Sequence, residues 1–249
     1  MPELQTLMTG IAFGESPRWH DDRLWFSDWG AQEIIAVDLE GNSEVVARVP
    51  SFPFCIDWLP DGRLLIVSAR DRSLLRREPD GSLATHADLS SLSEHPWNAI
   101  VVDGRGNAYV GNTGFDFPGG EFAPGILALV APDGSARQVA SGFAFPNGIV
   151  VTPDNSTLIL AESYANRLTA FDIAADGSLS NRRVWTDLGD GVPTAFASMR
   201  RARSGTGTSL TGGACAFARV ARYCRRSSST AAASPACWAG STGEPCSWW

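Results

Sequence analysis

A short pattern recurs four times along this 249-residue chain: an aspartate-containing turn followed by an apolar strand. The copies read HDDRLWFSD at 20–28, LPDGRLLIVS at 59–68, VVDGRGNAYVG at 102–111 and VTPDNSTLILAES at 151–163. Strand-like stretches between them carry turns of the Asp-Gly type, whose glycine supplies the positive φ of a tight hairpin. Each period of about 40 to 50 residues therefore holds roughly four short strands, the size of one β-propeller blade.

This repeat predicts an all-β chain folded as a β-propeller. A sandwich or barrel would also give short strands and regular turns, but it would not give the same pattern four times. The turn aspartates follow one another at intervals of 40, 42 and 51 residues: Asp21, Asp61, Asp103 and Asp154. Residues 1–193 are expected to encode about four blades, fewer than a closed ring needs.

The character of the chain changes at residue 194. Residues 1–193 carry 13 Arg and 26 acidic residues, whereas residues 194–249 carry 7 Arg and the single acid Glu244. The chain contains no Lys, which suggests a GC-rich gene. Four of its five cysteines also lie beyond residue 193, at spacings that match no zinc-binding pattern. The two parts therefore differ in charge, in cysteine content and in periodicity.

A shifted reading frame explains this change. If one base is missing after Pro193, PTAFASM reads back as Pro-Asp-Gly-Ile-Cys-Leu-Asp, and the end of the chain reads back as Asp-Gly-Arg-Thr-Leu-Phe-Met-Val. The restored turn aspartates fall at Met199 and Thr242, which continues the period of the repeat. We interpret residues 194–249 as a frameshifted segment, irregular or poorly packed. A disulfide-linked module or a basic tail that binds nucleic acid is a less favoured reading.

Polar residues hold matching positions ahead of the repeated turns. Glu15 precedes the first strand, Asn98 lies five residues before Asp103, and Asn147 lies seven residues before Asp154. Equivalent positions of successive blades converge on the central channel of a propeller. Carboxylate and amide oxygens that meet there would suit a hard divalent cation. A solvated charge at Glu15 and a turn role for Asn147 remain alternatives.

The motifs FGESPRW, WNAIVVDGRGNAYVG and FPNGIVVTPDNSTLILAES resemble the family of senescence marker protein, gluconolactonase and luciferin-regenerating enzyme. That resemblance implies a six-bladed propeller that holds one divalent metal ion, Ca²⁺ or Zn²⁺ with Mg²⁺ or Mn²⁺ as further candidates, and acts on lactones and related esters. It implies that Glu15 and Asn147 are metal ligands and that Asn98 contacts substrate or metal-bound water. Thr194 stands where the family has a ligand aspartate.

Two further departures concern the substrate side of the site. The family often has Asn-Asp where this chain has Asn98-Ala99, and an arginine where it has Pro96. The substrate is therefore expected to be a small lactone whose identity the resemblance does not fix. A nucleophile mechanism without metal is disfavoured, because no GxSxG motif is present and Cys55 lies in an apolar stretch.

These observations predict a metal-dependent lactone hydrolase of the gluconolactonase type, with activity impaired at Thr194. A non-catalytic binding propeller and an inactive product are the alternatives. The first ten residues lack both a basic start and an apolar run, and no stretch approaches the length of a membrane span. We therefore expect a soluble cytoplasmic protein with no membrane or nucleic-acid partner, and its oligomeric state stays open.

Overall fold

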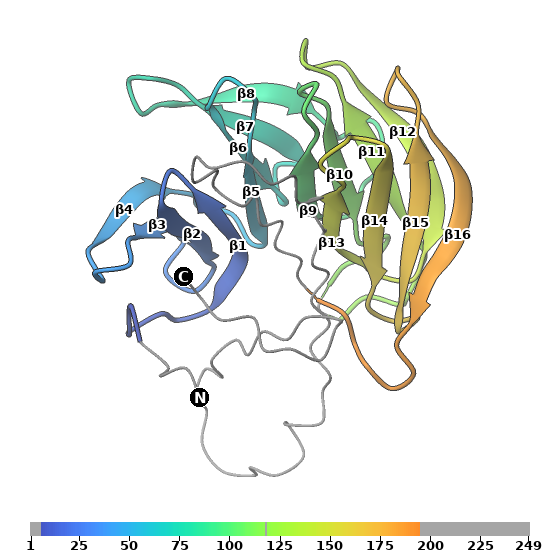
Figure 1. The fold of residues 1–249 in the computed structure, drawn as a ribbon, viewed down its shortest axis with the longest axis horizontal. Helices are drawn as coiled ribbons and strands as arrows, with labels where there is room; N and C mark the ends of the chain where they lie inside the picture. Colours follow the sequence, from blue (N-terminus) through green and yellow to red (C-terminus); the bar gives the residue numbers. More distant parts are fainter. Residues whose placement is uncertain (1–5, 118, 195–249) are drawn as a thin grey trace, which may run out of the picture.

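The computed structural model describes residues 6–117 and 119–194. These residues form sixteen β-strands and no helix. Consecutive strands pair antiparallel in four sheets of four strands each (Figure 1). The strands are β1 (Gly14–His20), β2 (Arg23–Asp28), β3 (Glu33–Val37), β4 (Ser43–Arg48), β5 (Phe54–Trp58), β6 (Leu64–Ser68), β7 (Ser73–Arg77), β8 (Leu83–Asp88), β9 (Trp97–Val102), β10 (Ala108–Asn112), β11 (Gly125–Val130), β12 (Ala136–Phe143), β13 (Pro146–Val151), β14 (Thr157–Glu162), β15 (Arg167–Ile173) and β16 (Leu179–Asp187).

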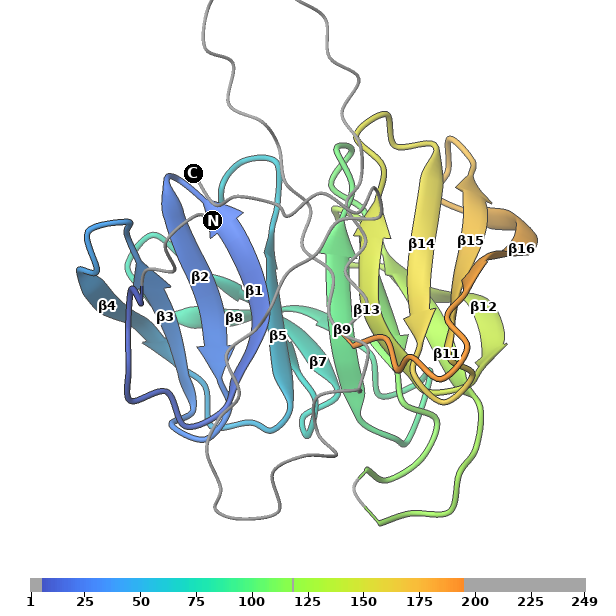
Figure 2. The same cartoon turned by 60° about the horizontal axis from the view of Figure 1, so that its bottom comes forward.

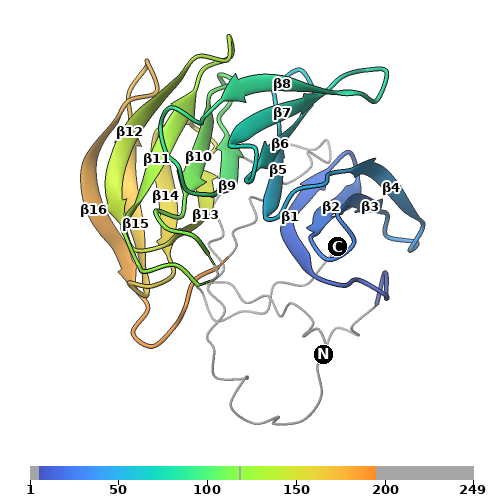
Figure 3. The same ribbon diagram turned by 180° about the vertical axis from the view of Figure 1, so that it is seen from behind.

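The four sheets follow one another around a common axis. The first strand of each sheet lies innermost, so β1 contacts β5, β5 contacts β9, and β9 contacts β13 (Figure 2). The last strands, β4, β8, β12 and β16, lie at the periphery, as the view from behind also shows (Figure 3). Each sheet is therefore one propeller blade, which confirms the predicted fold class and the four blades expected from the repeat.

The hairpin that opens each blade contains the aspartate of the repeated pattern. In the second blade Gly62 has φ of +85°, and the Asp61 carboxylate accepts a hydrogen bond from the Arg63 N–H at 3.1 Å. The first blade uses a two-residue turn instead, in which Asp21 and Asp22 have φ of 47° and 58°. Two positive φ angles give the type I′ geometry that matches strand twist, and aspartate tolerates them without glycine.

Apolar side chains fill the spaces between neighbouring blades. One core cluster joins the second and third blades through residues such as Leu65 and Ile100, and a second joins the third and fourth through Tyr109 and Leu158. Strands β6 and β10 are buried along their whole length because both of their faces are covered. This face-to-face packing holds the innermost strands side by side along the channel.

We predicted that residues 194–249 are irregular or poorly packed. All of these residues except Thr194 lie outside the described residues. Thr194 is the last residue described, and it is exposed. Within residues 6–117 and 119–194, no helix has the length and apolarity needed to cross a membrane.

Truncation of an interblade core residue should destabilise the fold strongly. Leu65 is fully buried between the second and third blades, so Leu65→Ala should lower the free energy of unfolding by about 2–5 kcal/mol. The control Val45→Ala removes an exposed side chain of β4 and should change it by about 0.5 kcal/mol or less. Urea denaturation of both variants measures the difference. Equal midpoints would show that the blades do not pack as described.

Candidate metal centre

Three of the four innermost strands are interrupted by a bulge at the same end of the channel. In β1, Ser16 and Pro17 lie between the paired residues Glu15 and Arg18. In β9 the irregularity falls between Trp97 and Ile100, and in β13 between Pro146 and Ile149. Bulges turn side chains away from the regular pleat and are common beside functional sites. The innermost strand of the second blade, β5, pairs without interruption.

The bulges coincide with the polar residues predicted from the sequence. Glu15 borders the first bulge, and Asn98 and Asn147 lie within the other two. All three side chains line one cavity of about 160 Å³ at this end of the channel. The structure thus brings together the three residues that the sequence placed in a common register.

Glu15 is a carboxylate in a poorly solvated position. Burial raises the pKa of Glu15, and a hydrogen bond with the Ser16 backbone acts in the opposite direction. No ion pair links Glu15 to a cationic side chain within the described residues, although twelve such pairs or His contacts occur elsewhere in them. A partly buried negative charge without a cationic partner is suited to a bound cation.

Asn147 is oriented by a contact that the sequence did not reveal. Its Nδ2 donates a hydrogen bond to Ser163 Oγ at 3.2 Å, and the Ser163 hydroxyl donates to the Pro193 carbonyl at 2.6 Å. Because the amide nitrogen is engaged with Ser163, the amide oxygen is the atom left for a ligand in the cavity. Ser163 is buried at the end of the fourth repeat, where its side chain gave no sequence signal.

The chain returns to this same corner at Thr194. The Gly148 N–H donates to the Thr194 carbonyl at 2.7 Å, so Thr194 lies beside the bulge that contains Asn147. Residue 194 therefore lies close to Asn147, and a role for this position in the site stays a prediction. A threonine there supplies no negative charge.

Asn98 is buried and contacts Cys55 of the regular strand β5. The Cys55 thiol donates a weak hydrogen bond to Asn98 Oδ1 at 3.5 Å. Burial raises the pKa of Cys55 to about 12, so the thiol stays protonated at neutral pH. Cys55 is therefore a poor nucleophile, and its thiol helps to fix the Asn98 amide.

Apart from the Thr113 hydroxyl, which contacts two backbone carbonyls, the polar side chains at this cavity are one carboxylate and two carboxamides. Among the described residues no group of three His, Cys, Asp or Glu side chains lies close enough to hold a metal ion. Oxygen donors of this kind fit a hard cation such as Ca²⁺, which accepts carboxylate, amide and water oxygens, better than they fit the nitrogen and sulfur preference of zinc. A single carboxylate makes such a site weakly charged.

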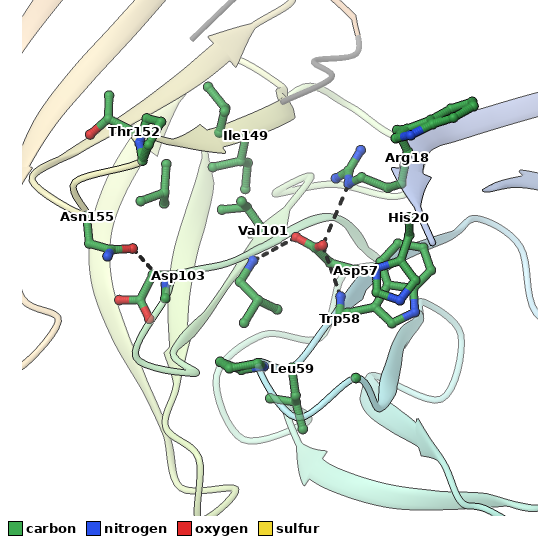
Figure 4. A pocket seen from close by; sticks show the side chains of 18 residues that line it. Arg18, His20, Asp57, Trp58, Leu59, Val101, Asp103, Ile149, Thr152 and Asn155 are labelled. Carbon is green, nitrogen blue, oxygen red and sulfur yellow. Dashed lines mark hydrogen bonds and ion pairs between the residues drawn. The ribbon is translucent and has the colours of Figure 1, made fainter. Parts of the chain in front are cut away.

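A larger cavity of about 430 Å³ opens at the opposite end of the innermost strands (Figure 4). Arg18 and Asp57 face each other there with 3.9 Å between Nε and Oδ1. Arg18 also donates to the Ile100 carbonyl at 2.8 Å, and Asp57 accepts from the Val102 N–H at 2.8 Å. These contacts tie together β1, β5 and β9. Arg18 and Asp57 thus link blades, whereas Glu15 at the other end has no such ionic partner among the residues that the structure describes.

Comparison with known proteins agrees with the propeller fold. The family model of the SMP-30/gluconolactonase/LRE-like region matches residues 13–199. A diisopropyl-fluorophosphatase of Loligo vulgaris is 28% identical over 178 residues, covering 62% of this chain and 55% of the relative. A pentonolactonase of Haloferax volcanii is 27% identical over 179 residues, covering 70% and 58%.

The chain spans less than three fifths of the length of these two relatives. Among solved structures, a gluconolactonase of Xanthomonas campestris superposes with a TM-score of 0.64 at 23% identity, covering 78% of this chain and 69% of that one. The match to the family model covers most of the sequence, including Glu15, Asn98 and Asn147. The chain belongs to the SMP-30/gluconolactonase/LRE-like family.

Proposed function

We propose that this chain is a divalent-metal-dependent lactone hydrolase of the gluconolactonase type, with a metal site weakened by Thr194. The observation that carries the proposal is the convergence of three bulged positions on one cavity, with a carboxylate that has no cationic partner within residues 6–117 and 119–194. Relatives that include a pentonolactonase support lactones as the substrate class. Glu15 and Asn147 are the proposed metal ligands.

The residues of the cavity suit this reaction. A divalent cation bound at such a site polarises an ester carbonyl and makes water more acidic. Glu15 provides the negative charge that attracts the cation, and Asn147, held by Ser163, provides an oriented amide oxygen. Asn98 lies at the same cavity and would contact the lactone or the attacking water. Aromatic side chains, Trp29 and Phe145 among them, line the rest of this cavity.

We expect Thr194 to lower both the affinity for the metal ion and the activity. A calcium site gains affinity with each charged oxygen ligand, and Thr194 leaves Glu15 as the single carboxylate among the proposed ligands. The family match ends at residue 199, shortly after Thr194, which supports the interpretation that the reading frame shifts after Pro193.

Removal of the metal should abolish lactone hydrolysis by the full chain. We expect activity toward a simple lactone, followed by pH-stat titration, to fall to background with EDTA and to return with excess Ca²⁺. Glu15→Gln should show no Ca²⁺-dependent activity, because the charged ligand is lost, whereas Glu40→Gln at an exposed turn should behave as the parent chain. Hydrolysis that persists in EDTA would contradict the metal mechanism. No hydrolysis with any divalent cation would favour the non-catalytic propeller.

A carboxylate at position 194 should strengthen metal binding. We expect Thr194→Asp to tighten Ca²⁺ binding by at least about tenfold, or about 1.4 kcal/mol, because it adds a second charged ligand beside Asn147. Isothermal titration calorimetry measures the change. The isosteric Thr194→Val should not tighten binding, and Thr85→Asp, at an exposed position of strand β8, controls for a general gain of negative charge. Equal affinities for Thr194→Asp and Thr85→Asp would place the site elsewhere.

Restoring the frame should raise activity further. Insertion of one base directly after the Pro193 codon should continue the chain with Pro-Asp-Gly and two more strand-rich blades. We expect Ca²⁺-dependent lactone hydrolysis at least about tenfold above that of the chain as written, at equal protein concentration, because the missing ligand and the rest of the ring return together. A restored chain that is insoluble or no more active would contradict the frameshift interpretation.

A further inference from the structure

The cavity above Glu15, Asn98 and Asn147 has largely apolar walls. Apart from these three floor residues, its lining is aromatic or proline with one threonine: Phe13, Trp29, Phe52, Pro53, Pro96, Thr113, Phe117 and Phe145. The Thr113 hydroxyl is already within hydrogen-bond distance of the Phe115 carbonyl at 2.8 Å and the Pro96 carbonyl at 3.2 Å. The walls therefore offer a ligand apolar surface and almost no free hydrogen-bonding group.

Two groups of aromatic rings in mutual contact form these walls. On the side of the first blade, Phe13 stacks on Trp29 with 5.4 Å between ring centroids, and Trp29 meets Phe52 edge-on at 5.3 Å. The Trp29 indole N–H donates to the Phe54 carbonyl at 2.5 Å, so this side chain presents its ring and not its N–H. Ring pairs at such distances hold each other in defined orientations.

On the side of the fourth blade, Phe145 is held in an unusual backbone conformation. Its φ is 60°, a left-handed angle that a bulky side chain rarely adopts. The Ser163 N–H donates to the Phe145 carbonyl at 3.1 Å, and Phe117 packs against the Phe145 ring with 5.0 Å between centroids. Backbone strain of this kind persists where surrounding contacts enforce it, and it clusters at ligand sites. Here it fixes an aromatic ring two residues before Asn147.

The size and polarity of the cavity suit one apolar ring. Its volume is about 160 Å³, and an apolar cavity of about 150 Å³ in another protein binds benzene. Several hydroxyls of a sugar lactone would lose water here without gaining partners, which disfavours their binding. Pro96, which stands where the family often has an arginine, is part of this wall.

We propose that this site selects lactones that carry an apolar or aromatic group over polyhydroxylated sugar lactones. The proposal rests on the proposed function, because it assigns the lactone carbonyl to the floor of Glu15, Asn98 and Asn147. The apolar substituent then lies between the two ring groups, with Phe117 and Phe145 on one side and Trp29 on the other. Phe117 is 41% exposed, so it can be exchanged with little effect on the core.

Two lactones with the same five-membered ring test the selection. γ-Phenyl-γ-butyrolactone carries a phenyl group and D-erythronolactone carries two hydroxyls. With Ca²⁺ and the full chain, we expect kcat/KM, divided by the uncatalysed rate constant of each lactone, to favour the phenyl compound by at least about tenfold. Phe117→Ser should reduce that preference by about tenfold, because kcat/KM should fall for the phenyl compound and stay unchanged for D-erythronolactone. A preference for D-erythronolactone, or an equal loss for both lactones in Phe117→Ser, would overturn the proposal.

A matched variant and a binding measurement separate this proposal from the proposed function. Phe122 packs against the Phe115 ring, as Phe117 does, and is 49% exposed. It does not line the cavity, so Phe122→Ser should keep the parent preference. If neither lactone is hydrolysed, the proposed function fails. The preference for an apolar group is then tested by measuring lactone binding with calorimetry. Binding of γ-phenyl-γ-butyrolactone that Phe117→Ser weakens and Phe122→Ser does not would support it. Absence of binding would overturn it.

Discussion

The packing of neighbouring blades against one another is the constraint on which the site depends. Apolar clusters between the sheets hold β1, β5, β9 and β13 side by side around the channel. These four strands run in the same direction along the channel. The first residues of each strand therefore meet at one end of the channel, and the last residues meet at the other. The two ends then acquire different chemistry from the same repeat. Arg18 and Asp57 link blades at one end, and at the other the Glu15 carboxylate has no ion pair within the described part of the chain.

The bulges convert this regular scaffold into a polar site. A regular strand sends alternate side chains to alternate sheet faces, whereas the interrupted strands β1, β9 and β13 direct Glu15, Asn98 and Asn147 to the channel. Strand β5 keeps its register and carries Cys55 at this end, which supports Asn98. Glu15 stays unneutralised within the described residues, and Thr194 sits beside Asn147 without a charge. The weakened metal site that we propose follows from this shortage of negative charge.

Much of the fold could be predicted from the sequence, because each blade repeats a local pattern of turn and strand. This pattern can be recognised without knowing which distant residues are in contact. The register of Glu15, Asn98 and Asn147 relative to those turns likewise predicted their convergence. The walls could not be predicted in this way. Trp29, Phe52 and Phe145 come from three connecting segments, and only packing between blades shows that they face one cavity. The Ser163 contact with Asn147 and the positive φ of Phe145 also depend on neighbours distant in the chain.

The position of a bound cation is the most direct test of the central claim, which is that the bulged strands build a metal site at one end of the channel. Crystals of the full chain soaked in Tb³⁺, a calcium substitute with strong anomalous scattering, would locate it. We predict an anomalous peak about 2.3–2.6 Å from a Glu15 carboxylate oxygen and the Asn147 amide oxygen, at the floor of the aromatic cavity. A peak at the Arg18 and Asp57 end, or only at exposed acidic turns, would contradict the account.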